Sequence, residues 1–306
     1  MKKIKIKFTD FWPGFDSYNN FILEKFSDKY DIEISDEPDY VIYSVFGWDF
    51  LNYDCIRIFF TGENVRPNFN LCDYAIGFDY LEFEDRYVRY PLGYVYAEDR
   101  RIASGLFGRI QSDSILKKDR FCNFIYSNGD TRTKRDEFFD LLSTYKKVDS
   151  GGRHRNNVGY RVDNKLEWLK SYKFTIAFEN SFGNGYATEK IIEAFAAHTI
   201  PIYLGDPLIG NEFNEKAFIN CHKYRDFDEV VDKVIEIDTD DKLYIDMLKE
   251  PVFLNRNILS VYKNNLEQFF SNIFEQDLEK CSRRVKYGVE LREERVLIKW
   301  VKENEL

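Results

Sequence analysis

The sequence predicts an α/β fold with parallel sheets, and three observations lead to that prediction. Hydrophobic residues make up 44% of the 306 residues, enough for packed cores, which excludes a disordered chain. Several short apolar runs are continuous rather than alternating, as is typical of strands covered on both faces. Helical stretches lie between these runs, which is the order of strand–helix–strand units. At about 150 residues per domain, the length predicts two domains.

The first strand is expected at the start of the chain, where Ile4, Ile6 and Phe8 alternate with lysines and no apolar signal segment follows. Further strands are expected at residues 40–46, 56–60, 121–126, 174–178 and 200–204. Helices are expected at residues 21–26, 135–145, 190–197 and 227–235. A domain boundary is expected within residues 100–119, which include Ala103-Ser104-Gly105 and a polar run.

The C-terminal tail, residues 275–306, is dense in charge and is expected to form a helix. Apolar residues recur there at near-helical spacing: Val285, Val289, Val296, Trp300 and Val301. We expect this helix to pack back on the body. A membrane-surface helix is the alternative because the tail carries several arginines, but acidic residues interleave with them.

Composition excludes several classes of protein. The formal charge of −9 argues against a nucleic-acid partner. No apolar run reaches the length of about 18 residues that a membrane span requires, so we expect a cytosolic protein. The five cysteines are scattered and odd in number, which argues against a disulfide scaffold or a zinc site.

Residues 172–205 carry the most informative chemistry. Glu179 and Asn180 follow a buried strand, a loop with two glycines comes next, and Thr188 is placed to cap the helix that contains Lys190. Ligands of open α/β sheets bind beyond the carboxyl ends of strands, and a helix N-terminus suits phosphate. The segment therefore favours binding of a nucleoside diphosphate. Alternatively, these residues could have the purely structural role of joining the elements of a strand–helix–strand unit. It matches neither the Walker loop nor the dinucleotide fingerprint.

This segment resembles the nucleotide-sugar signature of the α-1,3-fucosyltransferases. That signature is Phe-Glu-Asn-Ser, here at 178–181, then Tyr-x-Thr-Glu-Lys, here at 186–190, with Pro201 and Gly205 closing the next strand. Stretches at 61–69, 73–79, 127–135 and 151–156 also resemble the family. The likeness covers roughly residues 40–270 and is strongest to bacterial members. The tail departs from the bacterial pattern because it has no heptad repeats.

The resemblance implies a GT-B fold, in which two Rossmann-like domains face each other across a cleft and a C-terminal helical tail follows. Residues 1–118 would bind the acceptor, 119–270 would bind GDP-fucose, and 271–306 would form the tail. The implied reaction is inverting transfer of L-fucose to the GlcNAc 3-OH of N-acetyllactosamine-type glycans, giving a Lewis x-like product on lipopolysaccharide. The alternatives are another linkage or sugar donor, or a silent nucleotide-sugar-binding module.

The resemblance also implies roles for single residues. Glu63 matches the proposed general base, although a loop carboxylate could instead cap nearby N–H groups. Arg135 and Lys190 match the diphosphate ligands, although Arg135 could be an ordinary first-turn residue of its helix. Glu189 matches the ribose contact. Further donor contacts are expected from Asn128, Asn180, Tyr186 and Arg155. Trp12, Phe46 and Trp48 are candidates for the acceptor pocket.

No metal site and no required cofactor are expected. Asp-x-Asp patterns occur at 226–228 and 238–240. The first precedes Glu229-Val230-Val231, where capping a helix is the commoner role, and the second sits in a run of acids before another helix. Mg²⁺ or Mn²⁺ could still stimulate the reaction. The partners are expected to be GDP-fucose and a glycan acceptor, with peripheral contact between the tail and the inner membrane as a further option. The sequence leaves the oligomeric state open.

Overall fold

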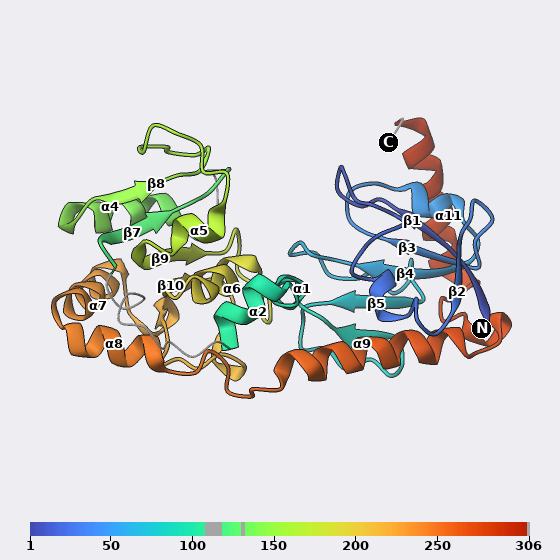
Figure 1. Ribbon diagram of the computed structural model, residues 1–306. Helices are drawn as coiled ribbons and strands as arrows, with labels where there is room; N and C mark the ends of the chain where they lie inside the picture. The colour runs from blue at the N-terminus through green and yellow to red at the C-terminus, as the bar shows by residue number, and fades with distance from the viewer. Residues whose placement is uncertain (108–117, 130–131, 305–306) are drawn as a thin grey trace. The chain divides into compact units, whose positions relative to one another are not determined.

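The computed structural model describes residues 1–107, 118–129 and 132–304, which divide into two compact units (Figure 1). Unit 1 comprises Met1–Tyr90 and the described part of Ser260–Leu306, and unit 2 comprises Pro91–Leu259. The named strands of each unit pair in parallel. The predicted α/β fold with parallel sheets is confirmed.

Unit 1 contains a six-stranded sheet in the order β2-β1-β3-β4-β5-β6. Its strands are β1 (Lys3–Thr9), β2 (Asp31–Ile34), β3 (Tyr40–Tyr43), β4 (Ile56–Phe60), β5 (Tyr74–Gly77) and β6 (Tyr87–Arg89). In β1, Ile4, Ile6 and Phe8 are buried between more exposed neighbours, as the alternation predicts. β3, β4 and β5 are buried along their whole length, as continuous apolar runs require.

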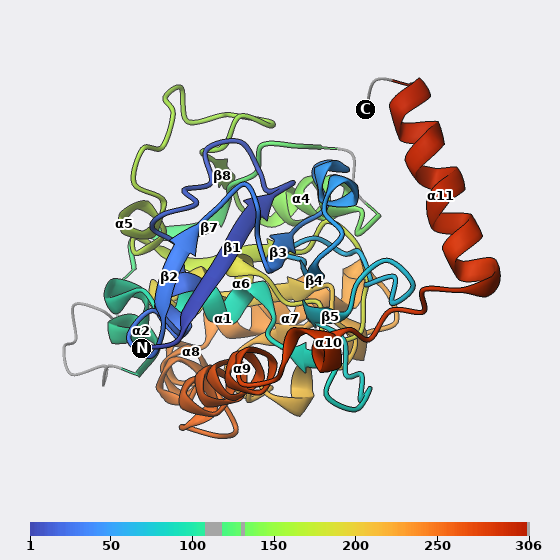
Figure 2. The same cartoon turned by 90° about the vertical axis from the view of Figure 1, so that its right-hand side faces the viewer.

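The C-terminal helices of unit 1 help to cover both faces of its sheet. Tyr40 of β3 packs edge-on against Phe274 of α9 (Ile258–Phe274), with 4.9 Å between ring centroids. Val41 and Tyr43 point to the other face, into an apolar cluster that includes Val301 of α11 (Gly288–Glu303). The shorter helices of the unit are η1 (Leu23–Lys25), η2 (Asp49–Asn52) and α10 (Leu278–Cys281). Figure 2 shows α9, α10 and α11 following one another.

A buried charge network joins the C-terminal segment to the sheet of unit 1. Asp73 is fully buried and accepts hydrogen bonds from Arg284 Nε, Arg57 N and Arg283 N at 2.8–2.9 Å. Glu294 of α11 pairs with both Arg57 and Arg284. Burial alone would raise the pKa of Asp73, but the charge of Arg284 and the backbone N–H groups lower it below its ordinary value. The segment after α9 is therefore an integral part of unit 1.

Unit 2 contains a five-stranded sheet in the order β11-β10-β9-β7-β8. Its strands are β7 (Arg120–Phe124), β8 (Val148–Ser150), β9 (Tyr172–Phe178), β10 (Ile200–Leu204) and β11 (Ile219–Asn220). Its helices are α1 (Leu92–Ala97), α2 (Arg100–Phe107), α4 (Arg135–Tyr145), α5 (Lys165–Leu169), α6 (Glu189–Ala196), η3 (Ile209–Asn211), η4 (Cys221–Lys223), α7 (Phe227–Thr239) and α8 (Asp241–Lys249). Phe138 of α4 stacks on Phe178 of β9 and meets Phe227 of α7. α6 packs on β9 and β10 and carries α1 and α2 on its outer side.

The division of the structure differs from the predicted domain boundaries at 118/119 and 270/271. Residues 103–105, expected near a linker, lie inside α2, which packs on α6 of unit 2. Gly105 serves this packing, since a Cβ there would lie 2.2 Å from the carbonyl oxygen of Ala196. The tail expected as a separate element from residue 271 belongs to unit 1. Residues 108–117 of the expected boundary lie outside the described residues.

The predicted helix at 21–26 is wrong. The structure has only the 3₁₀ turn η1 there, preceded by Asn20, whose side chain accepts hydrogen bonds from the backbone N–H groups of Ile22 and Leu23. These bonds have the geometry of an N-terminal cap, so they explain where the turn begins and not why it is short. Burial of Ile22, Leu23 and Phe26 in the core, rather than a helical repeat, explains the apolar pattern.

The predicted C-terminal helix is present as α11, but fewer of its apolar residues pack than expected. Val301 is buried, and Leu297 and Ile298 lie against the same cluster. Val289 and Trp300 are exposed. Within the described residues, no helix combines the length and apolar character needed to cross a membrane. Surface contact with a membrane stays a prediction.

In unit 2, Asp238 of α7 binds two lysines from other elements. Its carboxylate accepts hydrogen bonds from Lys173 Nζ at 2.8 Å, from Lys146 Nζ and from Tyr145 Oη at 3.1 Å. Burial would raise the pKa of Asp238, but Lys146 and Lys173 lower it below the ordinary 3.8. The folded state therefore holds this proton less tightly than the unfolded state does.

We expect acid to destabilise unit 2 partly through Asp238. A lowered carboxylate pKa contributes stability above the unfolded value of 3.8, and that stability is lost as the pH falls toward the folded value. Urea unfolding at pH 7 and pH 3 measures the difference, which should be smaller in Asp238→Asn than in the wild type. The exposed Asp232 of the same helix gives the control Asp232→Asn, which should keep the wild-type difference. An unchanged difference in Asp238→Asn would contradict the expectation.

Candidate active site

A cavity of about 660 Å³ in unit 2 lies beyond the carboxyl ends of β7 and β9 and beside the starts of α4 and α6. It is the position at which open parallel sheets bind ligands. Five of the predicted site residues line it: Asn128, Arg135, Asn180, Glu189 and Lys190. The strand-to-helix turns that follow β7 and β9 bring them together, because parallel strands end at one edge.

Arg135, the first residue of α4, is buried and lines the cavity. Its Nη1 donates to Asn180 Oδ1 at 3.1 Å, its Nη2 donates to the Asn128 carbonyl oxygen, and its guanidinium lies 4.0 Å from the ring centroid of Tyr126. Its Nε has no hydrogen-bond partner within the described part of the chain. Burial lowers the pKa of Arg135. A buried cation whose hydrogen bonds go to neutral groups is costly. The charges of Asp136 and Glu179 offset part of that cost, and an anion in the cavity would offset more of it.

Lys190 in the first turn of α6 is held by three acceptors. Its Nζ lies 2.9 Å from Thr188 Oγ1, 3.0 Å from Glu179 Oε2 and 3.1 Å from Glu189 Oε1. The Glu179 side chain is fully buried, whereas that of Glu189 is 24% exposed. Burial would lower the pKa of Lys190, but the two carboxylates raise it above its ordinary value. Lys190 is therefore a fixed cation at the wall of the cavity.

Thr188 occupies the predicted cap position of α6, but its side chain does not cap the helix. Instead its hydroxyl donates to Glu179 Oε2 at 2.7 Å, and its backbone N–H donates to Glu179 Oε1 at 2.8 Å. The buried Glu179 thus binds both the start of α6 and Lys190. Burial raises the pKa of Glu179, and the nearby ammonium opposes that rise.

Gly205, at the end of β10, leaves room for Glu179. A Cβ at Gly205 would lie 2.4 Å from Glu179 Cγ, and the bound carboxylate cannot move aside. We expect Gly205→Ala to destabilise unit 2 by about 1–3 kcal/mol, as measured by urea unfolding, and to weaken pyrophosphate binding. In the control Gly210→Ala, the new methyl would meet the carboxylate end of Glu215. That carboxylate also has partners, Asn220 and Lys223, but it is partly exposed and can shift together with the exposed Lys223. Equal losses in both variants would contradict this reading of Gly205.

Two predicted donor contacts do not line the cavity. Arg155 pairs with Asp140 of α4 at 3.0 Å through Nη1, so its charge is already partly neutralised. Tyr186 is buried, and its carbonyl oxygen accepts a hydrogen bond from Tyr203 Oη at 3.4 Å. The structure leaves both assigned roles as predictions.

Glu63 lies in unit 1, three residues after β4, and is exposed. Thr61 fixes its turn: the Thr61 hydroxyl donates to the Glu63 carbonyl oxygen at 2.7 Å and accepts from Glu63 N at 3.1 Å. Phe60 at the end of the same strand stacks on Phe11, and Trp12 beside Phe11 is partly exposed. The turn that carries Glu63 thus follows a strand whose end joins an aromatic cluster.

Sequence reasoning gave no role to three further cations that line the cavity, Arg153, Arg161 and Lys165. The sequence signal that could have identified Arg153 and Arg161 is the high density of basic residues after Gly151-Gly152 in an otherwise acidic chain. It also gave no role to the buried Glu179. Together with Arg135 and Lys190, these cations make the cavity suited to a polyanionic ligand.

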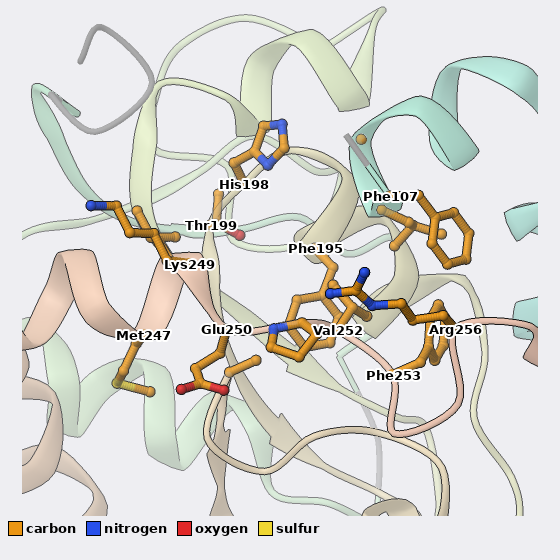
Figure 3. A pocket seen from close by; sticks show the side chains of 15 residues that line it. Phe107, Phe195, His198, Thr199, Met247, Lys249, Glu250, Val252, Phe253 and Arg256 are labelled. Carbon is orange, nitrogen blue, oxygen red and sulfur yellow. The ribbon is translucent and has the colours of Figure 1, made fainter. Parts of the chain in front are cut away.

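A second cavity of about 460 Å³ lies in unit 2 at the start of β10 (Figure 3). Phe195, Phe253 and Phe107 form apolar walls, and Arg256 and Lys249 are side chains of its lining. None of the predicted site residues lines it. The amino ends of strands are not where this class of sheet binds its ligand, so the first cavity is the candidate active site.

The two Asp-x-Asp patterns have other roles. Asp226 caps α7 through the backbone N–H of Glu229, and Asp240 caps α8 through those of Lys242 and Leu243. Among the residues that the structure describes, no three His, Cys, Asp or Glu side chains are grouped so that they could hold a metal ion.

Both units match models of known protein families. The family model described as "Alpha-(1,3)-fucosyltransferase FucT N-terminal domain" matches residues 6–96, and the model "Glycosyltransferase family 10 (fucosyltransferase) C-term" matches residues 115–251. The chain is 37% identical to the α-(1,3)-fucosyltransferase FucT of Helicobacter pylori over 84% of its own length. It is 29% identical to a putative fucosyltransferase of Acanthamoeba polyphaga mimivirus. It spans 62% and 42% of the lengths of these two relatives.

Solved structures agree with the family models. A crystal structure of an α1,3-fucosyltransferase with GDP-fucose has a TM-score of 0.78 and 33% identity, and the match covers 90% of this chain and 92% of that one. The HepE protein of Anabaena, in complex with UDP-glucose, has a TM-score of 0.54 over 89% of this chain and 100% of that one. Its identity is only 8%, so it shows a shared fold alone.

Proposed function

The chain belongs to the glycosyltransferase family 10 fucosyltransferases, and from that premise we propose that it transfers L-fucose from GDP-β-L-fucose to the GlcNAc 3-OH of N-acetyllactosamine-type glycans. The natural acceptor in this proposal is a lipopolysaccharide side chain, and the product is Lewis x-like. The reaction inverts the anomeric centre of fucose.

One observation carries the donor side of the proposal: Arg135 is a buried cation in the cavity wall whose hydrogen-bond partners among the described residues are neutral. Its Nε, which has no hydrogen-bond partner among the described residues, and the nearby Lys190 suit the two phosphates of GDP-fucose. Glu189 is the residue expected to accept hydrogen bonds from the ribose hydroxyls, and Asn128 and Asn180 hold Arg135 in place.

In the proposed reaction, Glu63 accepts the proton of the acceptor hydroxyl. The acceptor oxygen then bonds to C1 of fucose as the bond from C1 to the β-phosphate oxygen breaks, and the electron pair leaves with GDP. Arg135 and Lys190 stabilise the negative charge that builds on the leaving diphosphate. The proposal requires no metal, because these cations supply the charge, and activity should persist in EDTA.

The location of the reaction is also part of the proposal. We place it in the cytoplasm at the inner membrane, where exposed basic residues of α11 such as Arg292 and Arg295 would be attracted to anionic headgroups. The acceptor would lie against aromatic side chains of unit 1, among them the exposed Trp12.

A mass-spectrometric assay tests the function directly. GDP-fucose is offered with Galβ1-4GlcNAc, with Galβ1-3GlcNAc and without acceptor, and the product linkage is determined. Fucose on the GlcNAc O3 of Galβ1-4GlcNAc supports the proposal. Transfer only to O4, or from another sugar nucleotide, would favour the alternative transferase. GDP-fucose binding without product on any acceptor would favour a silent binding module.

A further inference from the structure

The hydrogen-bonding capacity of Lys190 is fully used in the structure. An ammonium group has three N–H donors, and three acceptors from Thr188, Glu179 and Glu189 already surround this one at 2.9–3.1 Å. A phosphate oxygen can therefore gain a hydrogen bond from Lys190 only if one of these acceptors gives way.

The three acceptors are not equally free to leave. Glu179 is fully buried and holds the backbone N–H and the hydroxyl of Thr188 as well as Lys190. If the Glu179 carboxylate moved away from Lys190, it would be a buried charge without a counter-ion, which is strongly unfavourable. Thr188 is also buried and fixed by Glu179. Glu189 is the partner that is partly exposed and lines the cavity itself.

We infer that Glu189 is an internal competitor of the donor diphosphate: it pairs with Lys190 in the ligand-free protein and moves from Lys190 to the ligand when the nucleotide binds. Glu179 stays as the permanent counter-ion that keeps Lys190 in place. This inference rests on the proposed function, because it names what the donor must displace at the same site.

The exchange predicts opposite contributions of Glu189 to two kinds of ligand. Pyrophosphate has phosphates but no ribose, so it must displace Glu189 and receives nothing from it in return. GDP must displace the same contact, but its ribose hydroxyls can then donate to the freed carboxylate. Glu189 therefore works against a bare diphosphate and favours the nucleotide, which makes it a residue that selects between them.

Calorimetric titration of the full chain with pyrophosphate and with GDP tests this inference, using Glu189→Gln and Glu189→Asp. Both variants should bind pyrophosphate about fivefold more tightly than the wild type, as loss of a partly exposed ion pair implies. The ratio of GDP affinity to pyrophosphate affinity should fall in both. The control Glu167→Gln removes a carboxylate from an exposed pair with Lys170 on α5 and should leave both affinities unchanged.

Glu189→Asp separates a contact from a long-range effect of charge, because it keeps the charge and shortens the side chain by one methylene group. Unchanged pyrophosphate affinity in both variants overturns the inference, and so does a gain in Glu189→Gln alone. Competition of pyrophosphate with GDP in the wild type shows that the two share the site. If the wild type binds no GDP, the proposed function fails instead, and the pyrophosphate gain still decides whether Glu189 competes at Lys190.

Discussion

Glu63→Gln is expected to lower kcat by at least about a hundredfold, with little change in affinity for GDP-fucose, because general-base catalysis contributes about 10²–10⁴ in rate. Glutamine keeps the shape of the side chain but cannot accept the acceptor proton at neutral pH. Glu63 belongs to unit 1, whereas the donor cavity is lined by residues of unit 2. The loss should therefore fall on turnover and not on donor binding. Steady-state kinetics and calorimetry with GDP measure the two quantities.

The position of Glu63 makes this variant informative. Its side chain is exposed, and its turn is fixed by hydrogen bonds between the Glu63 backbone and the Thr61 hydroxyl. Folding should therefore be unaffected by the substitution. Glu82, an exposed carboxylate after the neighbouring strand β5, gives the matched control Glu82→Gln, which should keep full activity. Wild-type turnover in Glu63→Gln would remove Glu63 from the role of base while leaving the donor site untouched.

Asp73→Asn is expected to destabilise unit 1 by about 3–5 kcal/mol, the usual loss when one member of a buried charge network is removed. The substitution keeps the volume of the side chain, so no cavity is created. It removes the counter-charge of Arg284 and places an amide group against the N–H donors of Arg57 and Arg283. Among the described residues, Glu294 is then the one carboxylate that still pairs with Arg57 and Arg284.

Tryptophan fluorescence in urea can follow this loss. Three of the four tryptophans, Trp12, Trp48 and Trp300, belong to unit 1, and Trp168→Phe would make the signal specific for that unit. The exposed pair of Asp54 with Lys286 involves the same C-terminal segment, so Asp54→Asn is the control and should change stability by less than about 0.5 kcal/mol. An equally small change in Asp73→Asn would mean that the network does not hold the segment.

The sequence predicted best what depends on short-range patterns. The expected strands at 56–60 and 200–204 and the helix at 135–145 coincide with β4, β10 and α4, because each is a continuous apolar run or an amphipathic repeat. The helix at 21–26 failed because its apolar pattern reflects burial of Ile22, Leu23 and Phe26 in the core and not a helical repeat. The structure divides at 90/91 and not at 118/119, because a contact between helices distant in sequence decides where α2 belongs.

The same distinction holds for the site. The resemblance implied that Asn128, Asn180 and Lys190 share one donor site, and the rule that parallel strands end at one edge explains why they line one cavity. The direction of Arg155 was not predictable, because it is set by Asp140, a partner on the facing helix. The role of Glu179 was not predictable either, since a motif does not show that a carboxylate is buried and binds three groups at once.

The return of the chain to unit 1 has a consequence for its synthesis. Unit 2 is one continuous segment that can fold as soon as it leaves the ribosome, but Asp73 must wait for Arg284, which follows it by 211 positions. At about 5–20 residues per second, this delay is roughly ten to forty seconds. During that time the nascent first ninety residues lack α9 and α11, so their apolar strands are exposed and are natural targets for chaperones.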